Sequence, residues 1–210
     1  MDEDVENCIS SNIQLMSSVD ADSLQKLHEA SFPVRYNKAF YDSVSTGIYR
    51  GVPMQAYTVR HDGEFAGAII GQLYESLSDA DESPMYSEEA IKLGYVSGCY
   101  VLTLATVEEY RRLGLGSKLL KKIISTSMLN PSCGAVYLHV ITYNNAAIRF
   151  YEAHGFYKVR TVYNFYLIKG KHYDAYLYVK LLHNATLSSP KSMWNSLLNT
   201  LSWVVSRFGF

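Results

Sequence analysis

The sequence predicts an α/β fold, a mixed sheet flanked by helices. Short segments rich in β-branched and aromatic residues recur along the 210 residues, and they alternate with segments of helical periodicity. The central stretch, residues 100–120, passes directly from an apolar strand into a helix. The chain length favours one domain with a substantial core.

Capping and turn residues predict the elements of the first half. Residues 1–11 are polar and are expected to be flexible. Asp20 or Asp22 can cap a helix whose apolar face is Leu24, Leu27 and Ala30. The other expected elements are a strand at 13–16, a helix break at 32–34, a helix at 38–44 ending near Gly47, a hairpin of strands 54–60 and 64–74 with turn 61–63, and an exposed insertion at 76–92.

The second half repeats the alternation of strand and helix. The helix that follows the central strand is expected to end near Asn130-Pro131. The later elements are a strand at 135–141, a short amphipathic helix at 144–153 closed by His154-Gly155, and a hairpin of strands 157–168 and 172–182 with turn 169–171.

Two glycines stand where the central strand turns into a helix, in the segment from Arg111 to Gly116. Glycine lets a backbone come close to a ligand, and the free N–H groups of a helix start favour an anion. The pattern therefore predicts a phosphate ligand, most plausibly a pyrophosphate. An ordinary glycine-containing turn is the alternative reading of the glycines alone.

Composition excludes several classes of protein. Near-zero net charge argues against nucleic-acid binding by charge alone. The three cysteines, Cys8, Cys99 and Cys133, lack CxxC spacing, so neither a disulfide framework nor a metal site is expected and a reducing compartment fits best. The acidic N-terminus is not a signal peptide, and no apolar run is long enough to span a bilayer.

The motif Arg-x-x-Gly-x-Gly at 111–116 resembles the acetyl-CoA signature of GCN5-related N-acetyltransferases (GNAT). Segments 137–140, 144–152 and 155–156 resemble the closing motif of the same superfamily. More narrowly, segments 32–36, 100–104 and 137–140 resemble protein N-terminal (Nα) acetyltransferases of the NatE and NatF types, over residues 12–183. The acidic insertion and the segment from Phe165 to Gly170 favour NatF.

This resemblance implies a GNAT fold, a mostly antiparallel sheet of about seven strands with about four helices. It also implies acetyl-CoA as co-substrate. The positions that match CoA-binding residues of the family are Leu104, Ala105, Thr106, Arg112, Leu113, Gly114, Leu115, Gly116, Ser117, Asn144, Tyr151, Glu152, Ala153 and His154. The family usually has Gly-Val where this chain has Ala105-Thr106. A helix cap is the structural alternative for Asn144 and is compatible with CoA binding.

The expected chemistry needs a base, because an α-amine with a pKa of about 8 is largely protonated at neutral pH. The resemblance assigns proton removal to Tyr100 and His139, directly or through a water, and leaves open which is the true base. Tyr151 could protonate the departing thiolate, or it could simply pack its helix. A backbone N–H near Leu104 is the candidate donor to the oxyanion. A hydrogen-bonded core histidine and a packed strand aromatic are the structural alternatives for His139 and Tyr100.

The peptide is expected to bind between aromatic and apolar walls that suit a methionine side chain. The residues that the resemblance assigns to this pocket are Phe32, Pro33, Val34, Tyr36, Leu102 and Tyr166. Half-buried sheet packing is the alternative for the tyrosines.

The C-terminal segment, residues 184–210, contains a strongly amphipathic helical pattern from Pro190 onward. Its apolar face is formed by Met193, Trp194, Leu197, Leu198, Leu201, Val204, Val205 and Phe208. The pattern favours a helix lying in a membrane interface, which agrees with the membrane attachment of NatF enzymes. A helix docked on the domain's own core is the alternative.

The resemblance thus implies acetyl transfer to N-termini that retain Met before Lys, Leu, Ile, Phe, Val or Ala. Expected clients are membrane proteins with cytosolic N-termini, with minor lysine or histone acetylation. The expected location is the cytosolic face of a membrane, the Golgi first and the plasma membrane second, for a monomer or weak homodimer. Three alternatives remain: a soluble NatE-like enzyme, a small-amine acetyltransferase, and a non-catalytic CoA-binding membrane adaptor.

Overall fold

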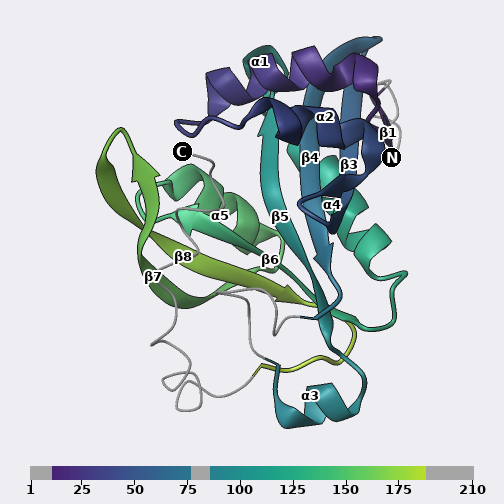
Figure 1. Cartoon of the computed structure of the whole chain (residues 1–210), viewed down its shortest axis with the longest axis vertical. Coiled ribbons are helices and arrows are strands. Elements are labelled where there is room, and N and C mark those ends of the chain that lie inside the picture. Colours follow the sequence, from purple (N-terminus) through teal and green to yellow (C-terminus); the bar gives the residue numbers. More distant parts are fainter. Residues whose placement is uncertain (1–10, 77–85, 188–210) are drawn as a thin grey trace, which may run out of the picture. The chain divides into compact units, whose positions relative to one another are not determined.

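The computed structural model describes residues 11–76 and 86–187 of the chain (Figure 1). The chain divides into two compact units, residues 1–71 with 102–123 and residues 72–101 with 124–210. Strand β5 (Ser97–Thr106) contributes its first half to the second unit and its second half to the first. This strand is therefore part of both units.

The first unit orders its strands β1-β3-β4-β5, with the two-residue strand β2 beside β3. Its elements, besides β5, are β1 (Ser11–Leu15), η1 (Ser18–Asp20), α1 (Ala21–Ser31), α2 (Lys38–Thr46), β2 (Ile48–Tyr49), β3 (Val52–His61), β4 (Glu64–Tyr74), η3 (Glu108–Tyr110) and α4 (Leu115–Ser127). The predicted hairpin is confirmed, but its turn contains only Asp62 and Gly63, both at positive φ, because His61 still belongs to β3 and pairs with Ser11. The helix α2 and its left-handed end at Gly47 are confirmed as well.

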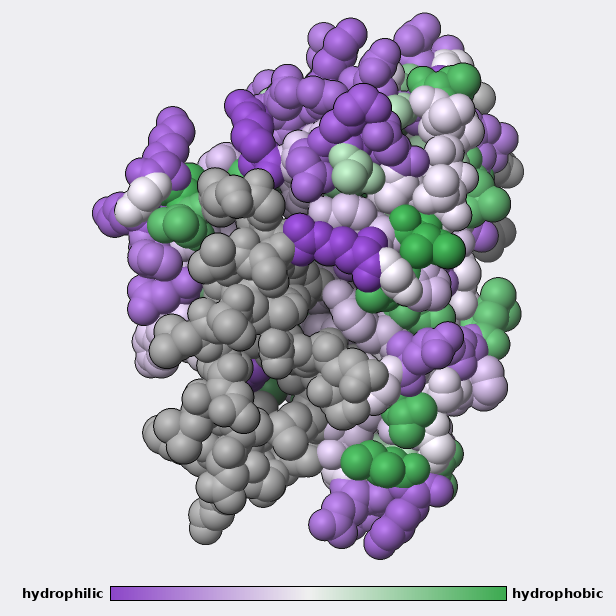
Figure 2. All heavy atoms as spheres, in the orientation of Figure 1, coloured by the Kyte–Doolittle hydropathy of each residue, from purple (hydrophilic) through white to green (hydrophobic). Residues whose placement is uncertain are grey.

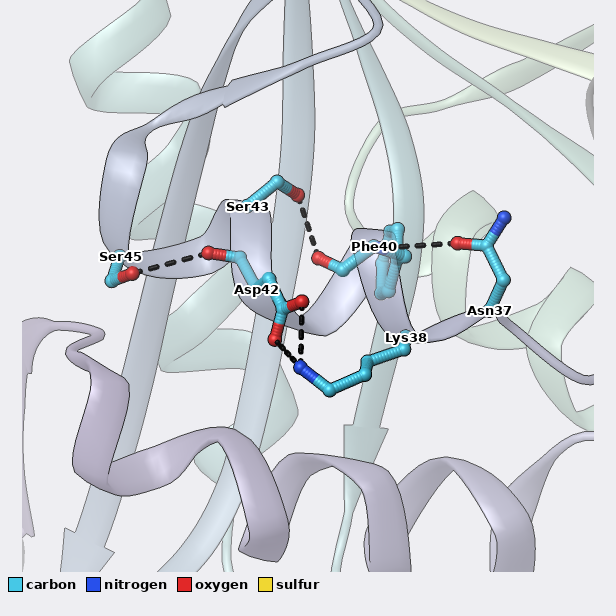
Figure 3. A network of polar contacts seen from close by, with 6 residues as sticks. All are labelled: Asn37, Lys38, Phe40, Asp42, Ser43 and Ser45. Carbon is cyan, nitrogen blue, oxygen red and sulfur yellow. Dashed lines mark hydrogen bonds and ion pairs between the residues drawn. The ribbon is translucent and has the colours of Figure 1, made fainter.

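Two helices cover one face of the sheet in the first unit. Leu24 and Leu27 of α1 and Phe40 of α2 are buried in one cluster with Ala56 of β3 and Ala68 of β4. The close-up in Figure 3 shows how α2 is fixed: the Asn37 side chain accepts from the Phe40 N–H at 3.0 Å, and Lys38 pairs with Asp42 at 2.8 Å.

Helix α1 begins directly after Asp20, as the sequence predicts, but the carboxylate does not cap it. The Asp20 side chain instead accepts from the Ser17 N–H at 3.1 Å and pairs with Arg60 of β3. The predicted apolar face is wrong at Ala30, which is exposed, because six positions at 3.6 residues per turn place it about 120° around the helix from Leu24. His28 takes that position and is 1% exposed.

Burial of His28 makes the stability of the protein sensitive to acid. Desolvation lowers the pKa of His28 from 6.5 to about 4. The unfolded chain therefore takes up this proton near pH 6.5, and the folded chain takes it up only near pH 4. Because the unfolded chain binds more protons between these values, the free energy of unfolding is unaffected by His28 above pH 6.5 and decreases as the pH falls below 6.5. We expect His28→Leu to remove about 2 kcal/mol of the stability difference between pH 7 and pH 5. Urea unfolding at pH 7 and pH 5 measures the free energy of unfolding, and His183→Leu, which replaces an exposed histidine, is the control. If His28→Leu loses as much stability between pH 7 and pH 5 as the wild type does, His28 is not the source of the acid sensitivity.

The second unit orders its strands β5-β6-β8-β7. Its elements, besides β5, are α3 (Glu88–Lys92), β6 (Cys133–Ile141), α5 (Asn145–Ala153), β7 (Tyr157–Ile168) and β8 (Lys171–Leu181). The predicted strand–helix–hairpin order is confirmed, although the last turn contains only Lys169 and Gly170, because Lys171 already pairs with Ile168. Together the strands and helices form the predicted α/β fold with a mixed sheet.

The insertion at 76–92 is not exposed throughout. Residues 77–85 lie outside the described part of the chain, but α3 follows them and the side chain of Tyr86 is 6% exposed. The Tyr86 hydroxyl donates to the Ser97 carbonyl at 2.7 Å, and Gly134 leaves room for its ring. The signal for this anchor was an aromatic residue inside an acidic segment, with Glu82 before Tyr86 and Glu88 after it.

The structure describes only residues 184–187 of the predicted C-terminal segment. Residues 184–187 pack on the second unit, where Ala185 is buried and the Ser87 N–H donates to the Thr186 carbonyl at 2.9 Å. The amphipathic segment from Pro190 onward lies outside the described residues, as do residues 1–10 of the predicted flexible start, whereas Ser11 already begins β1. Within residues 11–76 and 86–187, no helix has the length and apolar character to cross a membrane.

Candidate active site

Tyr100 and His139 lie on adjacent parallel strands of the second unit. Tyr100 of β5 pairs in register with Tyr137 of β6, and His139 follows two residues later on the same face. The Tyr100 hydroxyl lies 3.2 Å from His139 Nδ1, within hydrogen-bonding distance. Tyr100 is 5% exposed and His139 is 8% exposed. The fold thus brings together the phenol and the imidazole that the sequence pairs.

Strand β7 holds His139 in place. The Phe165 ring stacks on the His139 imidazole with centroids 4.0 Å apart and an angle of 18°. The neighbouring Tyr166 hydroxyl donates to the His139 carbonyl at 3.0 Å. Tyr166 therefore supports the strand that carries His139, in addition to its predicted role in the peptide pocket. The sequence placed Phe165 in a motif but gave no sign of this stacking.

Tyr151 of α5 is buried in the same unit, with 9% of the residue exposed. Burial, and secondarily the nearby Tyr100, raises the pKa of the Tyr151 hydroxyl above its ordinary value of 10. Its hydroxyl is consequently protonated at neutral pH, the form that a proton donor to a thiolate must have. The ring also makes edge contacts with Phe150 and Phe156, so the packing role exists as well.

The predicted pyrophosphate segment lies in the first unit and is exposed from Arg111 to Gly114. Arg112 has φ 64° and Gly114 has φ 75°, both in the left-handed region. Helix α4 then begins, with its first backbone bond from the Lys118 N–H to the Gly114 carbonyl at 3.1 Å. The N–H groups of residues 115–117 have no carbonyl one turn earlier in the helix, so they can bind an anion. Buried Leu115 anchors this end.

Residues 104–106 of β5 approach β4 of the same unit very closely. A Cβ on Gly67 would lie 2.8 Å from the Ala105 carbonyl oxygen and 3.2 Å from Thr106 Cα. The Val107 N–H donates to the Ala66 carbonyl at 2.9 Å just beyond. The absence of a side chain at Gly67 therefore allows the part of β5 that carries the predicted CoA positions to lie this close to β4. A glycine inside a strand pattern is a known sign of close backbone approach, and the sequence interpretation missed it.

The remaining predicted CoA residues lie at the two ends of α5. Asn144 caps the helix, with its Oδ1 accepting from the Ala147 N–H at 3.1 Å, so the helix-cap reading is confirmed. At the other end, Glu152 accepts from the Tyr178 hydroxyl at 2.8 Å, and His154 Nδ1 lies 2.7 Å from the Phe150 carbonyl. Ala153 is exposed.

The predicted peptide-binding residues are distributed between the units. Phe32 terminates α1, followed by exposed Pro33 and half-buried Val34. Tyr36 stacks on Phe40 at 4.4 Å, and both Tyr36 and Leu102 pack on the core cluster of the first unit. Tyr166 belongs to the second unit.

The chain belongs to the acetyltransferase (GNAT) family, whose model matches residues 21–156. Within this family it is similar to the histone acetyltransferase MCC1 of Arabidopsis thaliana, with 31% identity over 183 residues that cover 85% of this chain and 72% of the relative. It is also similar to N-alpha-acetyltransferase 60 of Xenopus tropicalis, with 30% identity over 166 residues that cover 78% of this chain and 66% of the relative.

Solved structures agree with this relationship. The chain is similar to Arabidopsis thaliana NAA60 in complex with acetyl-CoA, with a TM-score of 0.69, 30% identity, and coverage of 82% of this chain and 99% of the other. The same protein in complex with a bisubstrate analogue gives a TM-score of 0.69 and 31% identity, with coverage of 82% of this chain and 98% of the other. The GNAT fold and the NatF-like resemblance expected from the sequence are confirmed.

Proposed function

We propose that this protein transfers the acetyl group of acetyl-CoA to the N-terminal α-amine of proteins. The observation that carries the proposal is the buried pair of Tyr100 and His139, 3.2 Å apart, in a GNAT-family chain similar to N-alpha-acetyltransferases. Acetyl-CoA supplies an activated acetyl thioester. The residues of this chain have to remove a proton from the amine and accommodate charge on the acetyl oxygen.

Proton removal is the task of the Tyr100–His139 pair. A neutral imidazole has a proton affinity suited to an amine near neutral pH, and a phenol hydrogen-bonded to it can orient a bridging water. Tyr151, whose buried hydroxyl is protonated at neutral pH, is the candidate donor to the departing thiolate. The exposed N–H groups at the start of α4 suit the pyrophosphate, and the backbone near Leu104 is the candidate donor to the oxyanion.

The peptide preference follows from the resemblance and from aromatic chemistry. The positions that match the family's peptide-binding residues include the aromatic residues Phe32, Tyr36 and Tyr166, and aromatic rings suit an apolar first side chain such as a retained Met followed by Lys, Leu, Ile, Phe, Val or Ala. Lysine acetylation is the second candidate activity, because the relative of 31% identity is a histone acetyltransferase. Acetylation of small amines, and CoA binding without catalysis in a membrane adaptor, are weaker candidates that the same experiment separates.

A small peptide panel distinguishes these activities. The protein is incubated with acetyl-CoA and a Met-Lys peptide, the same peptide with a blocked N-terminus, a lysine-containing histone peptide with a blocked N-terminus, and spermidine. We expect fast acetylation of the free N-terminus and little of the others. Acetylation of the blocked peptides or of spermidine at an equal rate would contradict N-terminal selectivity, and no acetylation would favour the adaptor.

We also propose that the segment after Pro190 attaches the enzyme to the cytosolic face of a membrane, the Golgi first and the plasma membrane second. Its sequence pattern supports this, with large apolar residues on one helical face. On the face shown in Figure 2, the hydrophobic residues of the described part form separate small areas. The apolar face of the C-terminal segment is our candidate for insertion, in a protein that we propose to be a monomer or weak homodimer.

Polar substitution of two residues tests the attachment. We expect the double change Trp194→Ser and Leu198→Ser to move most of the protein from the membrane fraction to the supernatant, because each loses about 2–3 kcal/mol of buried apolar contact. Peptide acetylation should be unchanged. The control exchanges polar residues of the opposite face, Ser196→Asn and Asn199→Ser. Retention of the Trp194 and Leu198 variant in the membrane fraction would contradict the proposal.

A further inference from the structure

Strand β7 contains a bulge that includes Phe165, one of the two residues that contact His139, and that ends directly before the other, Tyr166. Val162 pairs with Ala175 and Tyr166 pairs with Tyr173, so β7 residues 163–165 stand opposite the one β8 residue 174. In the middle of the bulge, Asn164 has φ 55°, the left-handed region that few side chains tolerate. Bulges of this kind redirect side chains, and they occur often beside active sites.

The bulge is fixed by side chains of the partner strand. The Asn164 N–H donates to Asp174 Oδ1 at 2.9 Å, and His172 Nδ1 lies 3.3 Å from the Asn164 carbonyl oxygen. The backbone of Asp174 is itself fixed at the end of β6, because its carbonyl accepts from the Thr142 N–H at 3.1 Å. Asp174 therefore connects the bulge of β7 to the strand that carries His139.

The bulge determines how β7 meets His139. In a regular strand, neighbouring residues such as Phe165 and Tyr166 point to opposite faces of the sheet. Here both contact His139, the first through ring stacking and the second through a hydrogen bond to its carbonyl. Phe165 is 0% exposed, so close packing restricts its ring, which stacks on the imidazole.

We propose that Asp174 and the left-handed backbone at Asn164 are positioning elements that fix the His139 imidazole for proton transfer. The inference rests on the proposed function, because it gives these residues a role in the same reaction. Neither residue touches the reacting atoms. A bulge that serves only the stability of the hairpin would leave turnover and its pH dependence unchanged.

Two matched pairs of variants test the proposal. Asn164→Gly keeps the left-handed backbone and its N–H, whereas Asn164→Val opposes that conformation with a β-branched side chain. Asp174→Asn keeps an acceptor oxygen, whereas Asp174→Ala removes it. We expect Asn164→Val and Asp174→Ala to lower kcat for peptide acetylation about tenfold or more, with KM for acetyl-CoA unchanged. The acidic limb of the kcat/KM pH profile should move in both, and the Gly and Asn variants should stay within about threefold of wild type.

The outcomes are distinguishable. The control is Glu89→Gln, which removes the negative charge of an exposed carboxylate on α3. Folded Asn164→Val and Asp174→Ala with wild-type kcat and pH profile would overturn the inference while the proposed function stands, and so would equal losses in all four variants. If Asn164→Val does not fold, the Asp174 pair decides. Wild-type protein that acetylates no free N-terminus would end the proposed function itself, and this inference with it.

Discussion

Replacing His139 by alanine is expected to lower kcat for N-terminal acetylation by about a hundredfold or more, because general-base catalysis contributes a factor of about 10²–10⁴. The imidazole is 8% exposed and lies 3.2 Å from the Tyr100 hydroxyl, so solvent cannot readily replace it. Acetyl-CoA affinity should stay within about twofold, because the predicted pyrophosphate contacts are backbone N–H groups of residues 112–117, which the substitution does not change. Steady-state kinetics and calorimetry on the same preparation measure both quantities.

Two comparisons make the His139 result specific. His183→Ala removes an exposed histidine of the same unit that stacks on Tyr95, and it should leave kcat unchanged. Tyr100→Phe keeps the ring but removes the hydroxyl. A smaller loss in Tyr100→Phe than in His139→Ala would identify His139 as the base, and a larger loss would identify Tyr100. A folded His139→Ala variant with wild-type kcat would contradict the assignment of the pair.

Replacing Gly114 by alanine is expected to raise the Kd for acetyl-CoA about tenfold. Gly114 has φ 75°, directly before the α4 N–H groups that suit the pyrophosphate. A side chain there opposes the left-handed backbone, at a cost of about 1–2 kcal/mol, and occupies space that the ligand approaches. Isothermal titration calorimetry with CoA measures the change.

Gly170 provides a matched control for this substitution. It also has φ 75°, and neither glycine has a heavy atom within 4 Å of the position of an added Cβ. Gly170 lies in the turn between β7 and β8, so Gly170→Ala imposes the same backbone strain away from the helix start. Both variants should lose similar thermal stability, and only Gly114→Ala should lose CoA affinity. Equal Kd values in the two variants would exclude the glycine segment as the pyrophosphate site.

The sequence predicted the cap of α5 and the places of two hairpin turns, because each depends on residues that are close together in the chain. Asn144 precedes an amphipathic segment, and it caps α5 as its side chain allows. Asp62-Gly63 and Lys169-Gly170 form two-residue turns because each pair adopts positive φ between strands. The Tyr100 and His139 pair was found through a motif, and the register of two parallel strands brings the two side chains together.

Features that depend on distant residues were not predictable in this way. The bulge at Asn164 needs the Asp174 carboxylate ten residues later, and nothing within 157–168 indicates an interrupted strand. His28 is buried because the aromatic rings of Tyr36 and Phe40 close around it, which a single helix pattern cannot indicate. Tertiary packing decided these positions against their local preferences.

The most direct test of the central claim is a crystal structure of this protein with a bisubstrate analogue that joins CoA to a Met-Lys peptide. We expect the pyrophosphate on the backbone N–H groups of residues 112–117 and the peptide nitrogen within one water of Tyr100 and His139. An analogue bound with its nitrogen remote from both rings, or with its pyrophosphate on another segment, would contradict it.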